Sequence, residues 1–156
     1  YQVGYEWLNH SLAPIAVKAD ALRVMIGGPQ CKFPYSASIF NISAMSYGSL
    51  SKNAILSLNG GAKLGNFAHD TGEGGLSPYH LEPGGDIIWE IGTGYFSSRT
   101  KDGKFCPDNF KEKSNLPQVK MIEIKLSQGA KPSHGGILPG RKVTPEIAAI
   151  RGVPVG

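Results

Sequence analysis

The sequence lacks the features of several protein classes. No apolar run approaches the ~20 residues that a membrane-spanning helix needs, and the first residues do not show a signal-peptide pattern. Hydrophobic residues make up 40% and charged residues 18% of the chain, which excludes a disordered or fibrous protein. The basic residues are scattered, without an arginine-rich arm or alternation with aromatics, so the net charge of +4 does not indicate nucleic-acid binding.

Cysteine and histidine are too few and too far apart to suggest a metal centre. Cys31 and Cys106 show no C-x-x-C spacing, so the sequence has neither a zinc nor an iron–sulfur signature. The four histidines form no H-x-x-x-H pair. We therefore expect no metal site in this segment. Reduced thiols and a cytoplasmic location are the favoured interpretation, and a disulfide between the two cysteines is the alternative.

The chain is long enough for one domain. It begins at Tyr1 without a methionine and stops within a Val-Pro-Val-Gly connection. We therefore expect it to be a piece of a longer polypeptide, with any targeting sequence outside the piece. Residues 1–35 are predicted to be an irregular lead-in, and residues 36–156 to be the N-terminal part of an incomplete domain.

Strand and helix patterns alternate along the second of these regions. Strands are expected at residues 39–44, 66–69, 86–91 and 119–126, and helices from Ser49 or Ser51 to about Leu64, from Pro107 to Ser114, and from Thr144 to about Arg151. Strands separated by helices or long connections pair in parallel. Four such strands are half of a (β/α)8 barrel, which typically takes ~250 residues. We therefore expect an α/β chain holding about the first half of a TIM barrel; a small open doubly wound sheet is the alternative.

The most informative stretch is MIEIKLSQGAKPSHGGILPG, residues 121–140. It places Lys125, Gln128 and Lys131 just past an apolar strand, among several glycines. Polar residues at the carboxyl end of a buried parallel strand are typical of an active-site loop. Taken alone, this stretch is explained equally well as an ordinary long connection.

Two upstream loops repeat the same design. AMSYGS, residues 44–49, follows the first expected strand with Met45, suited to lie against a flat ring. HDTGEGG, residues 69–75, follows the second and sets Thr71 and Glu73 among three glycines. The second loop lacks the G-K-[ST] ending of a P-loop, so it does not support nucleoside triphosphate hydrolysis. Three such loops in succession favour a shared ligand site above the sheet.

A flavin is a ligand that suits these residues. When a flavin takes up electrons, negative charge develops at N1 and the C2 carbonyl, where the ammonium of Lys125 would stabilise it. The amide of Gln128 would bond the pyrimidine edge, and Lys131, further out, would hold a carboxylate or carbonyl of a substrate. The simpler alternative for Lys131 is a solvated loop lysine.

Three segments also carry a resemblance to a known family: FNISAMSYGSLS, HDTGEGG and IEIKLSQGAKPSHGGILPGRKVTPEIA. They resemble the FMN-binding synthase domain of glutamate synthase, and more closely the stand-alone glutamate synthase-like proteins that carry FAHDTGEGG and GGDIIWEIGTGYF. The resemblance covers the chain from about residue 36 to its end. It implies a TIM barrel that binds FMN, in which reduced flavin passes hydride to the imine of 2-oxoglutarate and ammonia, yielding L-glutamate.

The resemblance also implies roles for individual residues and partners. Lys131 would hold the oxo-acid at the catalytic centre, and Glu73 would have a supporting role there. The nitrogen would come from ammonia or from glutamine, with a glutaminase or reductase subunit as a partner. A 3Fe–4S cluster is compatible with the family, but this segment does not contain its cysteine ligands. The implied flavin contacts are Ala44, Met45, Ser46, Thr71, Lys125 and Gln128.

The chain departs from the family pattern at two positions associated with 2-oxoglutarate. Tyr95 stands where the biosynthetic enzyme carries an arginine, and Ile137 where it carries a glutamine. Each lost polar group removes bonds worth roughly 1.5–3 kcal/mol. Either the dicarboxylate binds differently, with Arg99 and His134 as candidates for compensation, or the substrate is another amine or oxo-acid.

Two alternatives to a glutamate synthase activity stay open at this point. One is a non-catalytic subunit or interaction module that has inherited a flavin-site sequence. The other is a related FMN enzyme; the nucleotide-dehydrogenase kind is disfavoured because neither Cys31 nor Cys106 lies in a glycine-rich loop. A half barrel exposes two strand edges, so we expect the 156-residue chain alone to be inactive and to self-associate.

Overall fold

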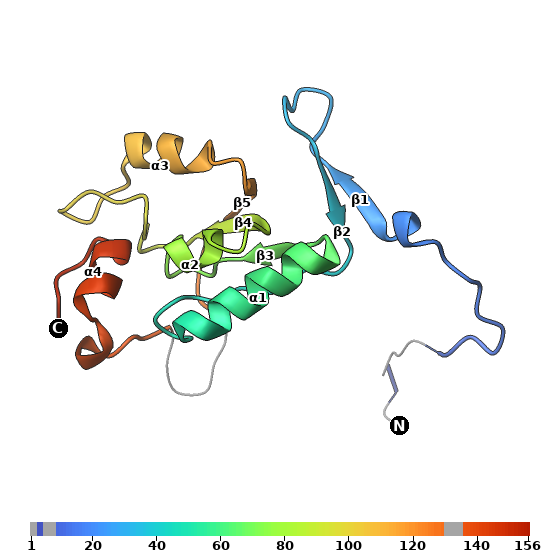
Figure 1. Cartoon of the computed structure of the whole chain (residues 1–156), viewed down its shortest axis with the longest axis horizontal. Helices are drawn as coiled ribbons and strands as arrows, with labels where there is room; N and C mark the ends of the chain where they lie inside the picture. The colour runs from blue at the N-terminus through green and yellow to red at the C-terminus, as the bar shows by residue number, and fades with distance from the viewer. Residues whose placement is uncertain (1–2, 5–8, 130–135) are drawn as a thin grey trace.

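The computed structural model of the chain describes residues 3–4, 9–129 and 136–156 (Figure 1). Its architecture is mixed α/β, with a three-stranded sheet, a separate two-stranded sheet and helices around the larger one. The strands are β1 (Arg23–Ile26), β2 (Tyr35–Ser38), β3 (Ala68–Asp70), β4 (Asp86–Ile91) and β5 (Val119–Ile124). The helices are η1 (Ala19–Leu22), α1 (Lys52–Gly65), α2 (Pro78–Leu81), α3 (Pro107–Ser114), η2 (Gly140–Lys142) and α4 (Pro145–Arg151), where η marks a short 3-10 helix.

The larger sheet is parallel and follows chain order, β3-β4-β5. A further segment lies beside β3, where Ile42 bridges His69 in parallel and its amide donates to the carbonyl of Ala68 at 2.9 Å. The strand expected over residues 39–44 is thus reduced to this single bridge. The physical reason is that the amide of Ile39 bonds instead to Leu22, which draws the preceding residues toward the N-terminal region. The α/β prediction is confirmed, whereas the sheet of the described residues is open and no closed barrel is seen.

The prediction of an irregular lead-in is wrong for its second half. β1 and β2 pair antiparallel, with Arg23 opposite Ser38 and Ile26 opposite Tyr35. This hairpin projects from the end of α1 in Figure 1; Arg23 donates to the carbonyl of Asn66 at 2.7 Å, and the Tyr35 hydroxyl donates to Asp86 of β4 at 2.8 Å. It also joins residues on both sides of the predicted boundary at residue 35, and that division of the chain remains a prediction. Successive residues of β1 are exposed on both faces of the hairpin. The sequence therefore lacks the alternation of apolar and polar residues that marks a half-buried strand.

The first long helix begins at a predicted cap, Ser51, and ends at Gly65, one residue past the predicted end near Leu64. The hydroxyl of Ser51 accepts from the amide of Ala54 at 3.2 Å, and Asn66 ends α1 in a left-handed conformation. Ile55 is fully buried on this helix. Asn59 is fully buried as well, and its side-chain carbonyl accepts from the amide of Gly85 at 2.9 Å, which fixes α1 against the start of β4.

Alternate residues of β4 face two environments. Ile87, Trp89 and Ile91 form the hydrophobic core on one face, where Phe110 of α3 stacks on Trp89 with ring centroids 5.7 Å apart. Ile88 and Glu90 point the other way. We call this second face of the sheet the inner face; the register adds Asp70 of β3 and Met121 and Glu123 of β5 to it.

Among the described residues, no helix is long and apolar enough to cross a membrane. Cys31 and Cys106 are both free thiols, and the cytoplasmic location stays a prediction.

Candidate functional site

A cavity of about 700 Å³ lies among the loops that follow the parallel segments. Six of the eight predicted site residues line it: Ala44, Met45, Ser46, Glu73, Lys125 and Gln128. The convergence follows from the parallel sheet, because the carboxyl ends of its strands meet at one edge. Thr71 is not part of the wall, and Lys131 lies outside the described residues, as does His134.

Glu73 is the centre of the polar network in this cavity. Its Oε1 accepts from the ammonium of Lys125 at 3.0 Å, and its Oε2 accepts from the Gln128 amide at 2.6 Å. Gly92 and Gly136 flank the same side chain, and a Cβ at either would come within 3.0 Å of a Glu73 atom. Gly92 after β4 and Gly136 in the expected loop of residues 121–140 therefore make room for a glutamate that orients two neighbours.

Contacts with Asp70 of β3 and His80 of α2 hold the loop of residues 44–46 in place. The amide of Met45 donates to the carbonyl of Asp70 at 3.1 Å, and Nε2 of His80 lies 2.9 Å from the carbonyl of Met45. Nδ1 of His80 lies 2.8 Å from the hydroxyl of Ser77, the residue that caps α2. Burial lowers the pKa of His80, so a neutral ring that donates from Nε2 fits both contacts. The buried histidine thus fixes the backbone of a predicted flavin contact.

The glycines of HDTGEGG pack against this loop. Gly72 has a φ of +65°, and a Cβ there would lie 2.4 Å from the hydroxyl oxygen of Ser46. A Cβ on Gly74 would lie 2.9 Å from Cβ of Ser46, whose hydroxyl accepts from the Gly74 amide at 3.2 Å. Only glycine permits this approach. Gly72 and Gly74 therefore bring two chain segments together.

Thr71 lies behind the wall of the cavity and is fully buried. Its hydroxyl accepts from the amide of Glu90 at 3.1 Å and donates to the carbonyl of Gly72 at 3.0 Å. In this position Thr71 ties the end of β3 to β4. Its predicted contact with a flavin stays a prediction.

The charges around Lys125 are predominantly negative. Besides Glu73, the carboxylate of Glu90 lies 3.8 Å from its ammonium. Burial acts to lower the pKa of Lys125, but the hydrogen bond and charge of Glu73, with Glu90 and Asp70, raise the pKa above its ordinary value. Burial is also the main cause that raises the pKa of Glu90, against the opposing effect of Lys125. Lys125 therefore stays charged at neutral pH.

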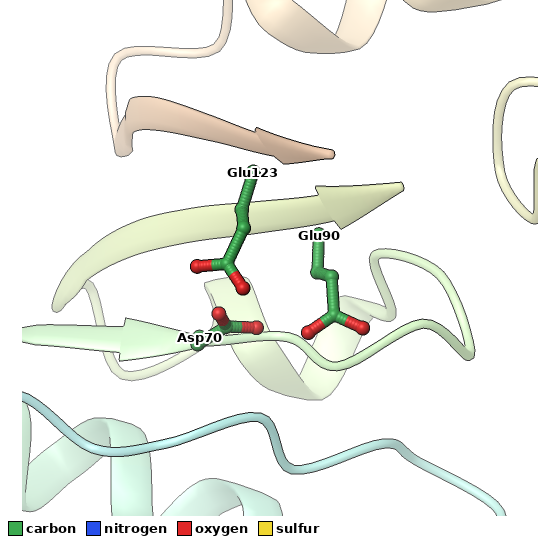
Figure 2. A group of neighbouring side chains, drawn as sticks. All are labelled: Asp70, Glu90 and Glu123. Carbon is green, nitrogen blue, oxygen red and sulfur yellow. The ribbon is translucent and has the colours of Figure 1, made fainter. Parts of the chain in front are cut away.

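Three carboxylates meet on the inner face, each from a different strand, and we call them the acidic cluster. Figure 2 shows Asp70, Glu90 and Glu123 pointing toward one another, and their oxygens lie within 4.8 Å of each other. Burial, together with the charges of Glu123 and Glu90, raises the pKa of Asp70 to about 7, although the Gly72 amide opposes the shift. The expectation of no metal site considered only histidine and cysteine spacing. It missed this cluster because the three acids meet only through the register of the sheet.

Arg151 also lines the cavity and was not predicted. The residue is 9% exposed; its guanidinium lies 5.1 Å above the ring of Phe96 and donates to the carbonyl of Tyr47 at 3.3 Å. Its Nε has no hydrogen-bond partner within the part of the chain that the structure describes. One signal was available: Arg151 follows the buried Ile147 and Ala148 at helical spacing, which places it on the inward side of α4.

The two departures from the family pattern lie in different places. Ile137 lines the cavity with an apolar side chain. Tyr95 instead borders a separate apolar cavity of about 390 Å³, against Phe105. Arg99, a candidate for compensation, donates to the carbonyl of Gly94 at 3.2 Å and does not line the larger cavity. Arg151, not Arg99, is therefore the arginine next to Lys125 and Gln128 in this site.

Comparison with known proteins agrees with the resemblance seen in the sequence. The model of the conserved region in glutamate synthase matches residues 18–156. The chain belongs to the glutamate synthase family. It is 46% identical to the glutamate synthase large subunit-like protein YerD of Bacillus subtilis over 145 residues, which is 92% of this chain and 27% of YerD. It is also 36% identical to the archaeal glutamate synthase [NADPH] of Methanocaldococcus jannaschii over 156 residues. This match covers 99% of this chain and 27% of that synthase.

The shared region is a fraction of each synthase. The chain spans about a quarter of the length of these relatives. An archaeal-type glutamate synthase [NADPH] of a Thermotoga species is 40% identical over 114 residues, which is 20% of its length. The described cavity thus lies in the region that this chain shares with these relatives.

Proposed function

We propose that the full-length protein is an FMN-dependent oxidoreductase of the glutamate synthase type, which reduces the imine of 2-oxoglutarate and ammonia to L-glutamate. Its synthase domain is a TIM barrel, and this chain holds about the first half. The observation that carries the proposal is that Lys125 and Gln128 meet the loop of residues 44–46 at one cavity. Membership of the glutamate synthase family supports it.

The cavity has donors and acceptors that suit a flavin. Lys125 offers a charged donor, and Oε1 of Gln128 has no donor among residues 9–129 and 136–156. An N–H of the pyrimidine edge would satisfy that oxygen. Bound in its reduced form, FMN would supply a hydride to the substrate. We infer that Lys125 and Gln128 hold the ring, with Met45 against its plane and Ala44 and Ser46 beside it.

Glu73 acts in this proposal by positioning other residues. Both of its oxygens are engaged, one by Lys125 and the other by Gln128. A carboxylate with both oxygens hydrogen-bonded is poorly placed to move a proton, but it fixes the positions of the Lys125 and Gln128 side chains. It also keeps Lys125 protonated, which stabilises negative charge on a flavin.

Arg151 is our candidate for the carboxylate of the oxo-acid. It is a buried cation that faces the cavity, and its Nε has no partner in the described segments. A carboxylate accepts two bonds from a guanidinium, which fixes orientation as well as charge. Lys131, which lies outside the described residues, would hold the carbonyl end of the substrate.

The reaction needs few steps from the protein. Ammonia and the oxo-acid condense to an imine with loss of water; the imine carbon then takes a hydride, and the nitrogen takes a proton. The nitrogen is free ammonia or comes from glutamine through a glutaminase subunit, and a reductase subunit would return electrons. We place the reaction in the cytoplasm, in agreement with the free thiols Cys31 and Cys106.

One observation favours a second candidate, a related FMN enzyme that acts on a different oxo-acid or amine. Ile137 gives the cavity an apolar surface where the family pattern has an amide. An apolar side chain forms no hydrogen bond with a distal carboxylate, so a less polar oxo-acid would fit this surface better.

The test is made on the full-length polypeptide that contains this chain. The purified protein is expected to be yellow, and Lys125→Met should weaken FMN binding by roughly 10- to 100-fold, the loss of one charge-assisted bond. Lys120→Met is the matched control, because Lys120 lies on β5, five residues before Lys125, does not line the cavity, and its ammonium bonds to the carbonyl of Pro117. A colourless protein that takes up no FMN would refute the proposal and favour the non-catalytic module.

The substrate is tested separately on the reduced holoprotein. We expect 2-oxoglutarate with ammonia to reoxidise it, and Arg151→Lys to raise the KM for the oxo-acid by about tenfold, since lysine cannot form the paired bonds. Reoxidation by a monocarboxylic oxo-acid but not by 2-oxoglutarate would favour the second candidate.

A further inference from the structure

The outer edge of β5 has no partner among the described residues. β5 pairs only with β4. Ile124 is 71% exposed, and Ile122 and Glu123 are exposed as well. An edge that combines unpaired backbone groups with exposed apolar side chains is a template for another strand.

The acidic cluster lies on the inner face beside this edge and is short of positive charge. Asp70 and Glu90 are 5% and 3% exposed, whereas Glu123 is exposed. Among residues 9–129 and 136–156, the cation nearest to the cluster is Lys125, 3.8 Å from Oε1 of Glu90, and its ammonium already donates to Glu73 at 3.0 Å. Oε1 of Glu90 has no hydrogen-bond donor in the described part of the chain. Three carboxylates therefore share part of one cation, which is an expensive arrangement inside a protein.

We propose that a strand-forming segment of the polypeptide outside residues 1–156 pairs along the free edge of β5 and places one lysine or arginine side chain over the acidic cluster. The relatives have further chain that could supply such a segment, because this chain spans about a quarter of their length. In a strand next to β5, every second side chain faces the inner face, and one of them lies beside Glu123. The inference rests on the proposed barrel and is independent of the flavin.

A side-chain cation fits the cluster better than a divalent metal ion. Ca²⁺ or Mg²⁺ takes six or more oxygen ligands, and Oδ1 of Asp70 is already bonded to the Gly72 amide at 2.7 Å. The other residues that the register sets on the inner face, Ile88 and Met121, offer no oxygen from their side chains. An ammonium or guanidinium needs only the carboxylate oxygens that are free.

The first measurement is the thermal stability of the full-length protein at pH 8.5. Glu123→Gln is expected to lower Tm by at least about 2 °C, because a cation seated on the cluster loses a partner. Glu112→Gln on the exposed side of α3 is the matched control and should leave Tm unchanged. The high pH matters: above the Asp70 pKa of about 7, a proton shared between Asp70 and Glu123 no longer contributes.

Without a cation, removal of Glu123 would relieve repulsion among like charges. An unchanged or raised Tm in Glu123→Gln would therefore overturn the proposal. So would a loss of Tm that disappears after dialysis against EDTA, because a metal ion would then be the partner.

The second measurement is hydrogen exchange of the full-length protein, which tests the pairing of the edge. The amides of residues 119–124 are expected to exchange as slowly as those of 86–91 in β4, which is paired on both sides. Fast exchange confined to residues 119–124 would overturn the proposal. Neither measurement uses the flavin: a colourless protein that passes both would refute the proposed function alone.

Discussion

Replacing Glu73 by glutamine tests whether this residue positions Lys125 by its charge. The substitution keeps the size of the side chain and its bond to Gln128, but it removes the negative charge 3.0 Å from the Lys125 ammonium. At that distance, Coulomb's law gives an attraction of about 5–6 kcal/mol at an effective dielectric constant near 20 and about 1.4 kcal/mol in water.

The pair lies between these limits. The side chains of Lys125 and Glu73 are 27% and 24% exposed, so solvent screens them in part. Desolvation and lost side-chain freedom reduce the net value further. Charged hydrogen bonds in proteins contribute roughly 1.5–3 kcal/mol, and we expect the lower end, about 1.5–2 kcal/mol.

A double-mutant cycle measures this value directly. Urea unfolding gives the unfolding free energy of Glu73→Gln, of Lys125→Met and of the double variant. The coupling energy is the change in the double variant minus the sum of the changes in the two single variants. The chain offers a matched control in Asp102 and Lys104, an ion pair at 3.3 Å with side chains 62% and 81% exposed. Asp102→Asn and Lys104→Met should show no measurable coupling, because exposed pairs contribute little.

The comparison of the two pairs decides the question. If the coupling of Glu73 with Lys125 is as small as that of the exposed pair, Glu73 does not hold Lys125 in place. The positioning role would then be refuted, whatever the flavin affinity of the variants.

Two further predictions concern the 156-residue chain alone. Asp70→Asn should raise its stability at pH 8: the folded pKa of about 7 lies above the ordinary value of 3.8, so the wild type loses stability as pH rises from about 4 to 7. Urea titrations across this interval check it, with the exposed Asp20→Asn as control, and a wild-type stability that increases with pH would contradict it. The chain should also self-associate through the β5 edge and the exposed Ile122 and Ile124; gel filtration at several concentrations tests this, and a monomer at all of them would refute it.

The sequence predicts the parts of the fold that depend on local signals. Ser51 and Thr144 begin α1 and α4 with a side-chain cap, as expected. The apolar segments that became β4 and β5 were recognised with nearly correct bounds. Because parallel strands end at a common edge, it was also foreseeable that Lys125 and Gln128 would meet the loop of residues 44–46.

What the sequence did not predict depends on long-range placement. The position of Arg151 beside the cavity requires α4 to pack on the loop at Tyr47, where Glu146 accepts from the Tyr47 hydroxyl at 2.7 Å. Glu123 and Glu90 face each other only through the register of β4 and β5. The hairpin of β1 and β2 was missed because its residues lack the alternation of a half-buried strand.

The acidic cluster and the proposed flavin site are coupled through Lys125. This ammonium lies between Glu73 at the cavity and Glu90 in the cluster, and the charges of both carboxylates raise its pKa. A bound flavin that gains negative charge on reduction would share Lys125 with them, so unneutralised carboxylates nearby would oppose reduction. A cation from outside residues 1–156, placed over Glu123, would offset the cluster and leave more of the field of Lys125 for the ring. The part of the polypeptide outside residues 1–156 would then tune the electrostatics of the proposed flavin site, whereas the side chains proposed to bind the ring lie within residues 1–156.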